Sequence, residues 1–318
     1  MKTNILISLL MICLLGACDT LVTEIPRKDL HNTTSRLVVQ SFISPQAARI
    51  YVVVTESIPL FGESSSSNAV IKDAVVKISG GGREAVLPYD SVSQLYSIEK
   101  AQLPIIPSET YKLSVSDKNR SVNATCTVPA KQVNIKSYRI DTAYITRRSG
   151  RPDTALVINA AWQDIPGERN FYRIRANMDI EYSILEGTGP ENFEEKRVRN
   201  RLSFSWDDDS GRSDFQNDMN LDGTSFTSPP GRSFLPSTLL YTSVDGIRYY
   251  ARQKPKLIAL FIEVNNAEES YYEYHKSLKL NEQSDNPFSE PALVFNNIKG
   301  GLGCFAAYNS GQLVYRPQ

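Results

Sequence analysis

The chain has 318 residues, which is enough for roughly two domains. Lysine and arginine together number 35, as do aspartate and glutamate, so the net charge is close to zero. A nucleic-acid-binding protein generally presents a strongly basic face, and this balance argues against that class.

Residues 1–17 are predicted to form a signal peptide. Lys2 precedes an apolar run from Ile5 to Leu15. That run is shorter than the about 20 apolar residues of a transmembrane helix. Leu15-Gly16-Ala17-Cys18 resembles a bacterial lipobox, in which the cysteine is lipidated and becomes the first mature residue. The alternative is an ordinary signal peptide followed by a chance cysteine. The lipobox interpretation predicts a stable lipid anchor at Cys18.

The next two segments are predicted to be a tether and a β-sandwich. Residues 18–35 hold the lipidated cysteine and a polar stretch that suits a flexible tether. Residues 36–130 carry short runs rich in β-branched residues, with a hairpin turn at Asp117-Lys118-Asn119. Strands at this spacing favour a sandwich that ends near Pro129. The predicted strands are 36–43, 48–57, 69–79, 109–115 and 121–128.

Residues 131–318 are predicted to form a second, mainly β domain with one amphipathic helix. From Tyr172 to Tyr182 apolar and polar residues alternate, which is typical of a long half-buried strand with one wet face. Residues 257–264 are apolar on both faces and predict a central strand. A helix is predicted over residues 266–280, with Asn266 as its cap and Glu269 in its first turn. Its apolar face holds Tyr271, Tyr274, His275 and Leu278.

Two cysteines remain after the signal peptide and the lipobox are set aside. Cys126 lies on the apolar face of a predicted strand and has the pattern of a small buried hydrophobe. A disulfide between Cys126 and Cys304 is the alternative in an exported protein. A single pair of cysteines in a chain of this length does not indicate a fold that is held together by disulfides.

Three glycines close to the carboxyl end raise the question of a phosphate-binding loop. Gly300, Gly301 and Gly303 match neither the spacing of a dinucleotide fingerprint nor that of a P-loop. They run into residues 304–308, which look like a strand. We therefore interpret them as a structural turn at which two backbones approach closely, and we expect no cofactor.

The acidic turn around residue 220 resembles half of a calcium loop. Asp218, Asn220 and Asp222 have the loop's spacing and precede Gly223. The twelfth position should be a bidentate glutamate, and here it is Pro229. Because Asp-Gly between strand-like segments is a strong turn signal, a hairpin is the favoured interpretation and calcium binding is the alternative.

No catalytic motif stands out. The chain has two histidines, His31 in the tether and His275 on the predicted helix, and a lone histidine among tyrosines is generally a packing residue. Neither HExxH, GxSxG nor CxxC occurs. A carboxylate pair for glycoside hydrolysis remains an alternative, because such pairing is spatial. We therefore expect a protein that is not an enzyme.

The longest predicted loops are candidate partner surfaces. They cover Ser57–Ala69, Gly187–Lys196 and Asp207–Asp222. The last begins with Asp207, Asp208 and Asp209, which would suit a basic partner. Solvated loops without a partner are the alternative.

Taken together, several stretches resemble a family of Bacteroidota lipoproteins known as domain of unknown function 4249. They are "DIPGERNFYRI" from Asp164, "NDMNLDG" from Asn217, "SYYEYHKSL" from Ser270, "NPFSEP" from Asn286 and "NIKGGLGCFAAY" from Asn297. Their order and spacing match over essentially the whole mature chain. The first half is also similar to the immunoglobulin-like sandwiches of carboxypeptidase regulatory domains, through "QLYSIE" from Gln94 and "SETYKLSV" from Ser108. That likeness concerns the fold and carries no activity.

The resemblance implies a place and a partner. Members of that family are typically outer-membrane lipoproteins encoded beside TonB-dependent receptors. We therefore expect a lipid-anchored protein of the outer membrane that acts as a non-catalytic partner of such a receptor. The alternative is a surface lipoprotein that hydrolyses a glycan or a peptide. The resemblance supplies no catalytic residues, and it makes the glycine turn and the acidic turn look like shared structural features.

Overall fold

A computed structural model describes most of the chain after the tether. The described residues are 35–58, 70–146, 152–189, 192–206, 212–236, 238–242, 248–282 and 293–317. The signal peptide, Cys18, the tether before residue 35 and Asp207, Asp208 and Asp209 therefore lie outside them, as does most of the predicted loop at residues 57–69. Within these ranges no helix is long and apolar enough to cross a membrane.

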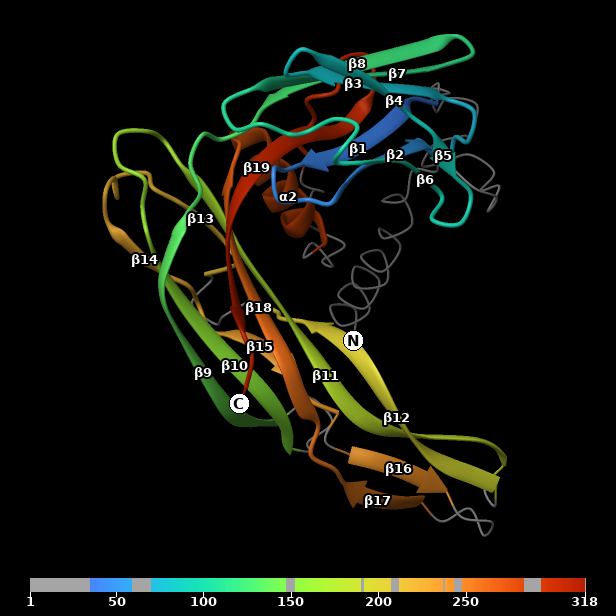
Figure 1. Cartoon of the computed structure of the whole chain (residues 1–318), viewed down its shortest axis with the longest axis vertical. Helices are drawn as coiled ribbons and strands as arrows, with labels where there is room; N and C mark the ends of the chain where they lie inside the picture. Colours follow the sequence, from blue (N-terminus) through green and yellow to red (C-terminus); the bar gives the residue numbers. More distant parts are fainter. Residues whose placement is uncertain are drawn as a thin grey trace, which may run out of the picture.

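The N-terminal part is a β-sandwich, at one end of the elongated molecule (Figure 1). One of its layers is built from β1 (Leu37–Ile43), β2 (Arg49–Glu56), β6 (Leu95–Glu99) and β5 (Tyr89–Asp90) in that order, which form one end of a sheet of nine described strands. The other has the order β4 (Arg83–Leu87), β3 (Val75–Gly80), β7 (Thr110–Asp117) and β8 (Arg120–Thr127). Alternate residues of β1, β2, β3, β7 and β8 point into a shared core that includes Val39, Val52, Ile78 and Leu113. The predicted sandwich is therefore confirmed, and the predicted turn at residue 118 joins β7 to β8.

The second half is built on longer strands. β12 (Asn192–Ser203), β11 (Phe171–Gly189), β18 (Lys256–Ala267) and β19 (Leu302–Tyr315) form the long end of the sheet that continues through β1, with β13 (Phe215–Asn217) beside β11. A second sheet holds β9 (Asn134–Thr146), β10 (Pro152–Gln163), β14 (Ser225–Thr227) and β15 (Gly231–Phe234). The core between them contains Trp162, Tyr172 and Ile262. β16 (Thr238–Thr242) and β17 (Arg248–Arg252) form a separate hairpin.

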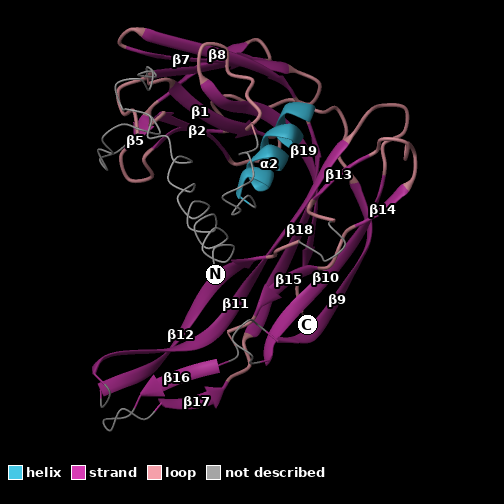
Figure 2. Cartoon of the chain, turned by 180° about the vertical axis from the view of Figure 1, so that it is seen from behind, coloured by secondary structure: helices cyan, strands magenta, loops and turns pink. Residues whose placement is uncertain are grey.

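One strand belongs to both halves of the molecule. β19 begins parallel to β1, with Val38 opposite Leu302, and continues antiparallel to β18, with Ile262 opposite Leu313. Its Phe305 lies in the sandwich core, while Tyr315 packs against the second core. Figures 1 and 2 show this strand running from the sandwich down into the long sheet. The division into 36–130 and 131–318 stays a prediction, but the last strand of the second segment completes the first sandwich.

The amphipathic helix is α2 (Glu269–Glu282), and it lies beneath the sandwich (Figure 2). Its predicted cap is wrong. Asn266 is still in β18, is 3% exposed, and donates its side-chain amide to the carbonyl oxygen of Lys131. The first helical hydrogen bond runs from the Tyr272 amide to the Glu268 carbonyl. The strand takes precedence because Asn266 has a cross-strand partner in β11, Tyr172.

Two predicted loops differ from the structure. The segment Gly187–Lys196 is mostly strand, because β11 continues to Gly189 and β12 starts at Asn192. The Asp-Gly turn is present, with the Leu221 amide donating to the Asp218 carbonyl and Gly223 at φ +70°. It is not a hairpin, since β13 pairs with β11 and β14 pairs with β10. The turn therefore carries the chain from one sheet to the other. The all-β class with a single helix among the described residues is confirmed.

Candidate functional site

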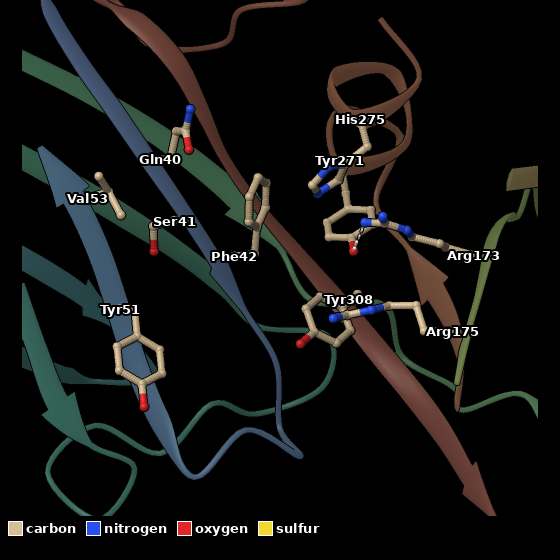
Figure 3. A pocket seen from close by; sticks show the side chains of 10 residues that line it. All are labelled: Gln40, Ser41, Phe42, Tyr51, Val53, Arg173, Arg175, Tyr271, His275 and Tyr308. Carbon is tan, nitrogen blue, oxygen red and sulfur yellow. Dashed lines mark hydrogen bonds between the residues drawn. The ribbon is translucent and has the colours of Figure 1, made fainter. Parts of the chain in front are cut away.

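A pocket of about 480 Å³ lies where the sandwich meets the helix and the long sheet (Figure 3). Strand alternation explains the side that the sandwich contributes. In β1, Val39 and Ile43 point into the core, so Gln40 and Phe42 point outward into the pocket. Tyr51 lines the same side from β2. The outer face of the N-terminal sheet is thus one wall of the pocket.

The helix supplies an aromatic wall. Tyr271 and His275 are four residues apart, so they lie on one face of α2. The Phe42 ring meets Tyr271 edge-on at 5.2 Å between centroids and lies 4.6 Å from the His275 ring. Tyr308, from β19, closes the floor beside them. The predicted apolar face of the helix thus packs against the protein, with Tyr271 and Tyr274 buried and His275 and Leu278 half-buried.

Two arginines enter from β11. Tyr172, Ile174 and Ala176 point into the core between the sheets, and the alternation sends Arg173 and Arg175 to the opposite face. Arg173 is fixed in place: its Nε donates to Asp214 at 2.9 Å and its Nη1 donates to the Tyr271 hydroxyl at 2.9 Å. Its guanidinium also lies over the Phe215 ring, 4.7 Å from the centroid.

Arg175 has a different environment. It is exposed, and no described carboxylate forms an ion pair with it. Its cross-strand neighbour in β18 is Glu263, which makes no ion pair with it. In Figure 3 its side chain extends into the pocket toward Tyr308. The pocket thus holds one guanidinium bound to the protein and one available for a ligand.

His275 lies between these charges, and no hydrogen bond to its side chain is formed by the described residues. Burial, together with the nearby guanidiniums of Arg173 and Arg175, lowers the pKa of His275 to about 3. The imidazole is therefore neutral at physiological pH. Its Nε2 is buried and has no partner among the described residues. A buried polar atom of this kind carries a free-energy cost that a ligand or a water molecule can remove.

A smaller pocket of about 280 Å³ lies on the other side of Arg173 and His275. Trp206 and Asp214 line it, together with Lys279 from the helix. Asp214 already accepts from Arg173, and the Lys279 ammonium lies 3.3 Å from it. Asp214, in the lining of this second pocket, therefore holds Arg173 in position.

The acidic turn gathers a different set of carboxylates from the one predicted. Asp218 and Asp222 come together with Asp164, and one oxygen atom of each lies within 4.8 Å of the others. Asn220 is exposed in the turn at φ +65° and is not part of this group. Each carboxylate already accepts a backbone amide: Gly223 donates to Asp164, Asn170 to Asp218, and Gly167 to Asp222. The three carboxylates therefore have a structural role: they bind backbone amides of the segments that connect the two sheets.

The glycine turn lies against the first strand. Gly300 has φ +83° and Gly303 has φ +112°, a region that favours glycine. A Cβ on Gly301 would lie 2.7 Å from the Leu37 carbonyl oxygen, and a Cβ on Gly303 would overlap that of Val39. Glycine is needed here because β19 enters the sheet directly beside β1.

The two cysteines are free and buried, so the disulfide considered as an alternative is not formed. Burial raises the pKa of both thiols. Cys126 packs as a small apolar side chain in the sandwich core, as expected from the alternation of its strand, and the Cys304 thiol donates to the Ser270 carbonyl oxygen at 3.5 Å.

Sequence reasoning named Tyr271 and His275 only as part of the apolar helix face and did not predict the pocket that they line. The alternation places Arg173 and Arg175 on the polar face of a long strand, but it does not predict which segments pack over that face. Phe42 and His275 are more than 200 positions apart in the sequence, and only the tertiary fold brings them into contact.

The fold and the site define an all-β protein with two cores, one shared strand and a helix-walled pocket lined by arginines and aromatic rings. The chain belongs to the family described as domain of unknown function DUF4249, whose profile matches residues 19–313. A search of curated proteins gave no match to the chain.

Proposed function

We propose that this protein is a lipid-anchored accessory protein of the outer membrane that works with a TonB-dependent transporter and catalyses no reaction itself. Three things support the proposal. The first 18 residues have the features of a lipoprotein signal, the chain belongs to the DUF4249 family, and the main pocket is lined by groups suited to recognition.

The lining of the pocket is the observation that carries most weight. It combines guanidinium groups, aromatic rings and a side-chain amide, which orient a ligand through hydrogen bonds and ring contacts. Glycoside hydrolysis would need two carboxyl groups about 5 to 9.5 Å apart. The described lining residues of the main pocket include no aspartate or glutamate. In the smaller pocket Asp214 is bound to Arg173 and Lys279. These facts favour binding over the hydrolase alternative.

Affinity purification of the tagged protein from native membranes in a mild detergent tests the proposal. We expect near-stoichiometric recovery of a TonB-dependent receptor. Replacing Asp207, Asp208 and Asp209 with asparagine should reduce recovery more at low salt than at high salt, because salt screens exposed charges. Recovery of the lipoprotein alone, together with turnover of a glycan or a peptide by the purified protein, would replace this proposal with the hydrolase.

A further inference from the structure

The main pocket has the chemistry of an anion site with a ring-binding wall. Its described lining contains Arg173 and Arg175 and no carboxylate. Arg173 is held by Asp214 and Tyr271, so its position does not depend on a ligand. Arg175 lies two residues further along the same face and has no ion-pair partner among the described residues. A guanidinium offers paired N–H donors that match the two oxygens of a carboxylate.

A second group in the pocket also lacks a partner. His275 Nε2 is buried, lies between the two pockets and makes no hydrogen bond to the described residues. It is an independent sign of a missing ligand, because it belongs to the helix and the arginines belong to β11. A neutral imidazole next to two guanidiniums can donate to an anionic oxygen or accept from a hydroxyl group.

The remaining walls are suited to a ring. Phe42 and Tyr308 flank the arginines, and Tyr51 lies at the rim with 46% of its surface exposed. Burial and the nearby Glu263 carboxylate raise the pKa of Tyr308 to about 12, so its hydroxyl remains a neutral donor and acceptor. A volume of about 480 Å³ is within the range of small-molecule sites.

We propose that this pocket binds a small carboxylate attached to a ring, with the carboxylate on Arg175 and the ring between Phe42 and Tyr308. This assignment rests on the proposed binding role and specifies its ligand class. The shared chemistry occurs in acidic sugars and in aromatic acids. A neutral ring of the same size would lack the contact with the guanidinium.

Calorimetric titration of the purified protein with two matched pairs of probes tests the assignment. The first pair is methyl glucuronide and methyl glucoside, and the second is benzoate and benzyl alcohol. We expect the anionic member of at least one pair to bind about tenfold or more tightly than its neutral match, as befits a charge-assisted hydrogen bond. Whether the sugar or the aromatic acid binds identifies the source.

Variants locate the binding. Arg175→Gln should weaken binding of the anionic probe by about tenfold or more, and Arg175→Lys should weaken it less, because charge is kept while the paired donors are lost. Arg197→Gln is the matched control, since Arg197 is an exposed arginine on β12 whose side chain is 79% exposed. It should leave binding unchanged.

Three results would overturn the assignment: no binding of either anion at millimolar concentration, equal binding of a neutral match, or equal losses from Arg175→Gln and Arg197→Gln. These results are separate from the purification of the receptor. If a receptor is recovered but neither anion binds, the proposed ligand class is wrong and the proposed accessory role stands. If an anion binds but no receptor is recovered, the ligand class stands and the accessory role is wrong.

Discussion

At the scale of single residues, the glycines at the start of β19 are tightly constrained by their neighbours. Gly303 pairs with Val39, and a Cβ there would overlap the Val39 carbonyl oxygen. Gly82 is a useful comparison because it also has a positive φ, at +73°, but a Cβ on Gly82 would meet no atom within 4 Å. The two glycines therefore separate the cost of backbone strain from the cost of steric overlap.

We predict that Gly303→Ala lowers stability by about 2 kcal/mol or more beyond the loss caused by Gly82→Ala, because both carry the strain and only Gly303 carries the overlap. Chemical denaturation of the two variants measures the difference. Equal losses would mean that β19 can shift away from β1 at little cost.

A second prediction at this scale concerns Cys18. The lipobox predicts that Cys18→Ser releases the protein from membranes into the soluble exported fraction, because the acyl chains that anchor it are no longer attached. Fractionation of the wild type and the variant, with palmitate labelling, measures this. A Cys18→Ser protein that still sediments with membranes and takes up label would contradict the lipoprotein assignment.

At the scale of elements, one carboxylate connects the helix to both sheets of the sandwich. Glu268 immediately precedes α2 and accepts the amides of Thr127 in β8 and Ala307 in β19, each at 3.2 Å. Burial raises the pKa of Glu268 to about 7, although these two amides oppose the shift. The folded protein therefore holds this proton more tightly than the unfolded chain, in which a glutamic acid has a pKa near 4.5.

This shift predicts a dependence of stability on pH. Because the folded pKa is raised, the contribution of Glu268 is fully present below about pH 4.5 and is lost as the pH rises toward about 7. His275 has the opposite slope, since its folded pKa is lowered to about 3. We expect Glu268→Gln to gain stability relative to the wild type between about pH 5 and about pH 8. Urea unfolding at both pH values measures the change, and a constant difference would contradict the raised pKa.

At the scale of the whole molecule, β19 makes the two halves depend on each other. Phe305 is fully buried in the sandwich core, while the other end of the same strand packs against the second core. The chain has two tryptophans, and both Trp162 and Trp206 lie in the second core. Their fluorescence therefore reports on the half that does not contain Phe305.

We predict that Phe305→Ala shifts the midpoint of tryptophan fluorescence along with that of circular dichroism, because the strand couples the cores. The loss should be about 3–5 kcal/mol, as is usual for a buried phenylalanine. Ile262→Ala, in the core that holds the tryptophans, is the control and should shift both midpoints too. A fluorescence midpoint unchanged by Phe305→Ala would show that the halves unfold independently.

Several elements could be predicted from local patterns alone. Alternation of apolar residues predicted β8 and β11, because side chains of a strand point to opposite faces whatever lies beyond them, and runs of β-branched residues predicted β1 and β2. The spacing of Tyr271, Tyr274 and Leu278 predicted the face of α2 that packs against the protein, because residues three and four positions apart lie on one face of a helix. The cap at Asn266 was wrong because pairing with β11 extended the strand past the capping signal.

The sequence by itself determined the all-β class and the faces of the alternating strands, since both depend on neighbours within a few residues. The need for glycine at the start of β19 comes instead from the backbone of β1, which is distant in the sequence. The tertiary structure alone decided the rest. It placed β19 between β18 and β1, and it brought Asp164 to the acidic turn. It also set Arg175 against Phe42 and His275 in one pocket. These are contacts between segments far apart in the chain, and no local periodicity contains them.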